Sequence, residues 1–169
     1  MKNVHNKGFT IFFALLVVGL VLGVGVSISS LSQKQIVLSY FSKQSQAAFY
    51  AADTGGECAR FWDIKNPDNP GESKFLSYNG STSISCGNQS IVVNRIAGTE
   101  PELFISNFKI ALKNTNLSSI DSVYSYCADV TVTKNLQTGE TQIASRGHNL
   151  DCNAPVSARK VERAIAITY

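Results

Sequence analysis

Four cysteines and two histidines are the residues of this 169-residue chain that most readily form covalent bonds or bind metals. Cys58, Cys86, Cys127 and Cys152 are separated by 27, 40 and 24 intervening residues. Zinc sites usually draw their cysteines from closely spaced pairs such as C-x-x-C, and no such pair occurs here. An even number of widely spaced cysteines is typical of disulfides formed in an oxidising compartment. We therefore expect two disulfides, with no metal and no other cofactor.

The pairing stays open at this point, because four cysteines allow three connectivities. We favour Cys127 with Cys152, since a hairpin predicted between them returns the chain close to its starting point, and this leaves Cys58 with Cys86. Closing the loop from Cys127 to Cys152 stabilises a fold by about 3 kcal/mol in the loop-entropy estimate.

His148 lies near Asp151 and Cys152, and a histidine beside a cysteine also occurs at nucleophilic catalytic sites. The even cysteine count favours a disulfide for Cys152, and a solvated loop histidine is the ordinary interpretation of His148. His5 is an equally poor candidate for catalysis. The sequence has no phosphate-binding glycine loop, no H-E-x-x-H pair and no EF-hand loop. We expect no catalytic residue and no enzyme activity.

Residues 9–26 are an apolar run in which Thr10 is the only polar side chain, a length that suits a membrane-spanning helix. Lys2 and Lys7 precede the run, and no acidic residue occurs before Asp53. The positive-inside rule therefore predicts a cytoplasmic amino terminus and an exported remainder. A cleaved secretory signal would end in a small-residue site, which the residues after the run only weakly imitate. A plain single-pass anchor explains the run but not the residues at its start.

That start, Lys7-Gly8-Phe9-Thr10-Ile11 after a short basic leader, resembles type IV pilins and pilin-like proteins. The resemblance implies that a prepilin peptidase cuts after Gly8 and methylates the new amino-terminal residue, Phe9. Residues 45–58 resemble the Ala-Phe-x-Ala-Ala-Glu segment of the PilX-type minor pilins, with Asp53 where that subfamily often has glutamate. In the family a disulfide commonly borders the carboxy-terminal region, which agrees with the favoured pairing.

The chain departs from the family at Phe13. Most major pilins carry a glutamate there, which is thought to neutralise the free amino group of a neighbouring subunit. An uncompensated amine in a filament core is costly. Pilin-like subunits that lack this glutamate are known as minor or initiating components, so the resemblance favours a minor subunit.

A stripe of apolar or small residues continues beyond the run, at alternating steps of four and three residues: Val37, Phe41, Gln44, Ala48, Ala51, Gly55, Cys58 and Trp62. No proline precedes Pro67, so we predict one helix from Phe9 to about Asp63, on the order of 80 Å long. Coiled coils share this repeat but prefer Leu, Ile and Val, whereas small residues favour docking of the stripe on the chain's own sheet. Gly19 and Gly23 form a Gly-x-x-x-Gly pair, which permits close helix packing but also occurs in ordinary lipid-facing helices.

The sequence after Asn66 is rich in β-branched and aromatic residues between turn signals. We predict strands over residues 82–86, 90–96, 103–113, 123–134, 141–146 and 161–169. The predicted fold is α+β, with a long amino-terminal helix packed on an antiparallel, pilin-like sheet. The expected organisation is a leader (1–8), a transmembrane helix (9–30), an amphipathic helical stalk (31–63) and a β-rich head (64–169).

Five basic residues of the predicted head could form a patch for DNA: Lys134, Arg146, Arg159, Lys160 and Arg163. Ten basic and nine acidic residues in 64–169 are more typical of a solvated surface.

The resemblance implies a structural, minor subunit of a type IV pilus or related filament, anchored in the cytoplasmic membrane and carried to the cell surface on assembly. Its expected partners are other pilin subunits, the pilus assembly machinery, the prepilin peptidase and the membrane. A pseudopilin of a type II secretion system is one alternative. Another is a membrane-anchored module that binds a surface ligand or DNA and does not polymerise.

Overall fold

The computed structural model describes residues 7–76, 81–96, 103–113, 125–155, 157 and 159–169. These residues form one long α-helix, one short 3₁₀-helix and six strands. In chain order they are α1 (Lys7–Ile64), η1 (Lys74–Leu76), β1 (Thr82–Cys86), β2 (Gln89–Ile96), β3 (Leu103–Lys113), β4 (Ser125–Asn135), β5 (Thr141–His148) and β6 (Glu162–Thr168). The predicted α+β class, with a helix packed on an antiparallel sheet, is confirmed. All six predicted strands are present, with ends that shift by two residues at most among the described residues; the predicted start at Val123 lies outside them.

The chain divides into two compact units, Met1–Ser42 and Lys43–Tyr169. The boundary falls inside α1, so the helix residues from Lys43 onward belong to the same unit as the sheet. The predicted organisation divides the helix into a transmembrane part (9–30) and a stalk (31–63), with the head over 64–169. The structure thus groups the distal part of the predicted stalk with the head.

Helix α1 ends where the sequence stops supplying helix-compatible residues. The backbone N–H of Lys65 donates to the carbonyl of Phe61, which completes the last turn. Asn66 and Pro67 follow, and proline disfavours helical geometry in the residue before it. The side-chain amide of Asn66 then donates to the carbonyl of Glu72 at 2.7 Å, which fixes the first turn of the loop.

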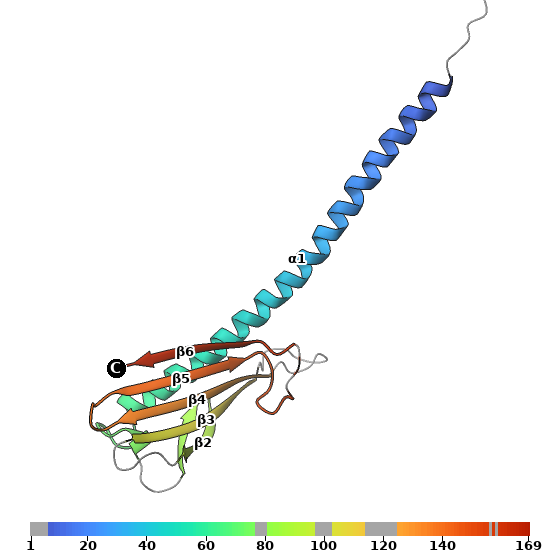
Figure 1. The fold of residues 1–169 in the computed structure, drawn as a ribbon. Helices are drawn as coiled ribbons and strands as arrows, with labels where there is room; N and C mark the ends of the chain where they lie inside the picture. Colours follow the sequence, from blue (N-terminus) through green and yellow to red (C-terminus); the bar gives the residue numbers. More distant parts are fainter. Residues whose placement is uncertain (1–6, 77–80, 97–102, 114–124, 156, 158) are drawn as a thin grey trace, which may run out of the picture. The chain divides into compact units, whose positions relative to one another are not determined.

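The six strands form one antiparallel sheet in which spatial order follows chain order, from β1 to β6 (Figure 1). The β4–β5 hairpin was the clearest in the sequence, and its register pairs Lys134 with Thr141 and Val132 with Ile143. Its turn is stabilised by Asn135, whose side-chain oxygen accepts the N–H groups of Gln137 and Thr138 at 2.9 and 3.2 Å.

One face of the sheet is apolar and packs on the distal part of α1, in accord with the period of two along each strand. Buried side chains on this face include Phe108 and Ile110 of β3, Val130 and Val132 of β4, and Ile143 of β5. The facing residues of α1 are small or flat: Ala48, Ala51, Ala52, Gly55, Gly56, Ala59 and Trp62 are all buried.

Small residues are required on this helix face because the backbones of helix and sheet lie very close. A Cβ atom added to Gly147 of β5 would lie 1.9 Å from the carbonyl oxygen of Ala48 and 2.4 Å from the amide nitrogen of Ala52. A Cβ on Gly55 would lie 2.6 Å from the hydroxyl oxygen of Ser145. The prediction that this segment docks on the chain's own sheet is therefore confirmed from Ala48 to Trp62.

The β1–β2 hairpin covers the end of the core and is tied to the helix. The indole N–H of Trp62 donates to the carbonyl of Ser85 at 2.9 Å. A disulfide joins Cys58 of α1 to Cys86 of β1. By contrast, β2 pairs with β3 over only three residues, Asn94–Ile96 against Ile105–Asn107.

Candidate functional site

The residues expected to carry processing and assembly lie at the start of α1. Gly8 and Phe9 are both in the helix, and Phe9 is 73% exposed. Leader residues 1–6, including His5, lie outside the described part of the chain. Cleavage after Gly8 and methylation of Phe9 stay predictions.

The apolar segment of α1 is long and hydrophobic enough to cross a membrane. Its most apolar window of 18 residues has a mean hydropathy of 2.8, and none of it is buried within the chain. Large side chains from Phe9 to Phe41 are exposed throughout. Apolar surface left in water costs about 25 cal/mol per Å², so exposure of this segment to water is unfavourable.

Gly19 and Gly23 lie on the open surface of this segment. A Cβ atom built on either glycine has no heavy atom within 4 Å. The hydroxyl of Ser27 donates to the carbonyl of Gly23 at 2.9 Å, so this polar side chain is satisfied within the helix. Phe13 is 58% exposed. The surface is free for contact with another helix, and such packing stays a prediction.

The first two members of the predicted stripe, Val37 and Phe41, lie in the compact unit that does not contain the sheet, so their docking stays a prediction. Val37 and Phe41 are 55% and 47% exposed, and with Leu38 they line an open groove on the helix. Gln44 is the first stripe residue that is even partly buried. The sheet's last strands reach the helix at about this level, since the amide of Asn149 donates to Gln44 at 3.1 Å.

A buried ionic cluster around Asp63 anchors the end of α1 to the sheet. Asp63 is 8% exposed, and its two carboxylate oxygens lie 2.7 and 2.9 Å from the ammonium of Lys134. The carboxylate also accepts the hydroxyls of Ser73 and, at 2.8 Å, Tyr169. Lys134 donates further to the hydroxyl of Thr141 at 2.8 Å. Burial, together with the hydrogen bond to Asp63, raises the pKa of the Tyr169 hydroxyl.

This cluster was not predicted from the sequence. The basic residues were weighed as a DNA-binding patch or, more typically, a solvated surface, and neither interpretation fits Lys134. Its side chain is 14% exposed and paired with Asp63. The patch is also divided between faces: Arg163 lies opposite Gly147 on the helix side and donates to Ser45, whereas Arg146 lies opposite Ala164 on the other side. The isolated positions of Asp63 and Lys134 in the sequence gave no signal of their pairing.

The structure contains the disulfides Cys58–Cys86 and Cys127–Cys152, the pairing that the sequence favours. The first joins helix to β1, and the second joins β4 to the segment after β5. Both cysteine pairs lie in the unit that contains the sheet. In the described residues no group of three or more His, Cys, Asp or Glu side chains is placed to hold a metal.

His148 is not placed for nucleophilic catalysis, because the thiol of Cys152 is consumed in a disulfide. His148 is 8% exposed, and its Nδ1 lies 3.6 Å from a carboxylate oxygen of Glu162. Burial, reinforced by the charge of Lys160, lowers the pKa of His148 despite that carboxylate. The expected solvated loop histidine is therefore a buried residue at the end of β5.

No protein-family model, curated protein or solved structure matches this chain.

Proposed function

We propose that this protein is a pilin-like structural subunit, of the minor type, that is cleaved after Gly8, methylated at Phe9 and assembled into a type IV pilus or related filament. The observation that carries the proposal is the division of α1. Its distal part is buried on the chain's own sheet, whereas its apolar part, which follows the Gly8-Phe9 motif directly, stays exposed among the residues that the structure describes. A subunit that first enters the membrane and then packs among apolar helices requires such a segment.

In this proposal the apolar segment holds the subunit in the cytoplasmic membrane, with the sheet unit exported, until assembly. Other subunits then replace the lipid around it, and Gly19 and Gly23 allow close approach of a neighbouring helix. Two disulfides in the sheet unit suit an oxidising compartment outside the cytoplasm. The role is structural, and the partners are the prepilin peptidase, other pilin subunits and the assembly machinery.

The proposal is tested with Gly8→Val in native cells. Valine places a branched side chain at the bond to be cut, so we expect the variant to keep its leader, to stay in membranes and to be absent from sheared surface filaments. Gly25→Val is the matched control, because a Cβ at Gly25 also meets no atom within 4 Å but lies far from the motif. The control should be processed like the natural protein.

Two results would count against assembly by this route. One is a natural protein that retains Met1–Gly8 in every fraction, which favours a membrane-anchored binding module. The other is Gly8→Val protein that enters sheared filaments as well as the natural protein.

A further inference from the structure

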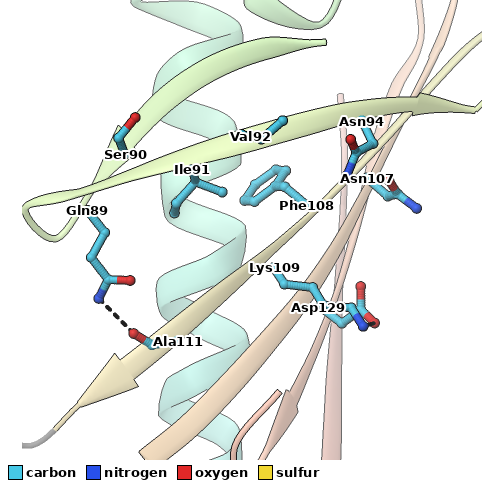
Figure 2. A pocket seen from close by; sticks show the side chains of 10 residues that line it. All are labelled: Gln89, Ser90, Ile91, Val92, Asn94, Asn107, Phe108, Lys109, Ala111 and Asp129. Atoms are coloured by element: carbon cyan, nitrogen blue, oxygen red, sulfur yellow. Dashed lines mark hydrogen bonds and ion pairs between the residues drawn. The ribbon is translucent and has the colours of Figure 1, made fainter. Parts of the chain in front are cut away.

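The sheet opens into a gap between β2 and β3. Beyond Asn94 and Asn107 the two strands separate: residues 89–93 pair with β1 alone, and residues 108–113 pair with β4 alone. The gap holds a cavity of about 380 Å³, within the range of sites that bind small ligands. Figure 2 shows β2 and β3 diverging around it.

Backbone groups of both strands point into this gap. The mutual hydrogen bonds between Thr141 and Tyr169 fix the alternation of the ladder. The registers of neighbouring strands carry this alternation from β6 to β2. The N–H and C=O groups of Lys109 and Ala111 therefore point toward β2, and those of Ser90 and Val92 point toward β3. In the described part of the chain no backbone group pairs with them across the gap. Strand edges of this kind are templates for another strand.

The side chain of Gln89 lies in the gap and makes a hydrogen bond to β3. The side-chain amide of Gln89 donates to the carbonyl of Ala111 at 2.7 Å, drawn as a dashed line in Figure 2. A carboxamide N–H has the same donor chemistry as a peptide N–H. Gln89 therefore makes the hydrogen bond that an added strand would make to β3.

The β1–β2 hairpin is held where it keeps the gap open. The Cys58–Cys86 disulfide and the Trp62–Ser85 hydrogen bond attach it to α1. These attachments oppose closure of β2 onto β3, which would otherwise satisfy the facing backbone groups.

The lining of the cavity defines the peptide that fits. Its floor is apolar, formed by Ile91 and Phe108, which are 7% and 2% exposed. Its rim is polar, with Asn94 and Asn107 at the narrow end and Lys109 lying 3.9 Å from Asp129. An extended segment with a small apolar residue toward the floor and hydrogen-bonding residues toward solvent complements both.

We propose that the gap between β2 and β3 binds an extended peptide segment of another protein by strand addition. The segment pairs with the edges at Lys109–Ala111 and Ser90–Val92, and its N–H replaces Gln89 on the Ala111 carbonyl. This proposal does not rest on the proposed filament role, because it uses only residues of the unit that contains the sheet.

The test uses the full-length protein in detergent micelles and the capped pentapeptide Thr-Val-Asn-Val-Thr. Amide hydrogen exchange is followed at Lys109 and Ala111. We expect fast exchange at both without peptide and slower exchange with it, at a dissociation constant of about 1 mM for so few hydrogen bonds. The same peptide with alternate backbone nitrogens methylated should bind at least about tenfold more weakly, since it lacks donors.

Two variants sharpen the test. Gln89→Ala removes the competing amide, so the peptide should bind about fivefold more tightly. Lys109→Pro removes a backbone donor that points into the gap, and should weaken binding by about tenfold or more. Ala166→Pro is its control, because the same alternation directs that N–H away from β5 at the outer edge of β6.

Three outcomes would overturn the proposal. Slow exchange of Lys109 and Ala111 without peptide would mean that the gap is closed in solution. Protection that appears at Ala164 and Ala166 instead would place the peptide on the outer edge of β6. Absence of any protection with peptide near its solubility limit would exclude strand addition here. Since the protein in micelles is unassembled, none of these results bears on the proposed filament role.

Discussion

The two parts of α1 share a helical repeat but differ in the size of the residues on the repeating face. Between Ala48 and Ala59 that face consists mainly of alanine and glycine, and it lies against the sheet with almost no exposure. Between Phe9 and Phe41 it carries Phe, Leu, Ile and Val, and it stays exposed. Small residues allow the helix backbone to approach the chain's own strands, whereas the large ones leave apolar area exposed. Residue size, and not periodicity, distinguishes the two parts of the helix.

The largest effect is expected for Gly147→Ala, where the added Cβ meets the backbone of Ala48 and Ala52. Neither backbone can move without undocking the helix, so we expect a loss of about 4 kcal/mol in the free energy of unfolding. Denaturant unfolding in micelles, followed by the fluorescence of Trp62, measures this loss. Gly25→Ala, in the exposed part of α1, should leave the unfolding midpoint unchanged.

The next largest effect is expected for Asp63→Asn, which leaves the buried ammonium of Lys134 without a charged partner. Breaking one side of a buried ion pair costs about 3 kcal/mol. The double variant Asp63→Asn with Lys134→Met should recover much of that loss, because no unpaired charge remains. A double variant no more stable than Asp63→Asn would contradict this assignment.

Removal of the Cys127–Cys152 disulfide by Cys127→Ala with Cys152→Ala should lower the free energy of unfolding by about 3 kcal/mol. The bridge closes a loop with a sequence separation of 25. The melting temperature of the natural protein should therefore fall when a reductant is added. An unchanged melting temperature would show that the bridge does not constrain the unfolded chain.

Gly55→Ala and Gly19→Ala compare the two parts of the helix directly. The Cβ at Gly55 would lie 2.8 Å from Val130 and 2.9 Å from Ala128, so we expect a loss of about 2 kcal/mol in the free energy of unfolding. At Gly19 the Cβ meets no atom within 4 Å, so the unfolding midpoint should not fall. Its effect is expected instead on recovery of the protein in sheared filaments. The reverse assignment of the two effects would refute the division of α1.

The smallest effect is a pH dependence from His148. Its folded pKa is lowered, so below pH of about 6.5 the unfolded chain takes up a proton that the folded chain resists. Stability is therefore expected to fall as the pH drops from about 6.5 through the folded pKa. The charges of Lys160 and Lys109 oppose protonation, and those of Glu162 and Asp129 favour it. His148→Gln should reduce the change of the unfolding midpoint with pH between about pH 5 and 7, relative to the natural protein.

The sequence was sufficient to predict the helix and the six strands, because each depends on local patterns. It favoured the observed cysteine pairing but could not fix it, since four cysteines allow three connectivities. The ion pair of Asp63 and Lys134 was missed, because the two residues are 71 positions apart and neither lies in a motif. The gap between β2 and β3 could not be predicted from the sequence, since both strands have the same alternation of residues as ordinary paired strands.

The central claim is that the exposed part of α1 begins at a processed amino terminus and serves assembly. The most direct test is intact-mass and peptide mass spectrometry of the natural protein from membranes and from sheared surface filaments. The account predicts a chain that begins at N-methylated Phe9 and is present in the sheared fraction. A chain that retains Met1–Gly8 in both fractions, or that is absent from filaments, would contradict it.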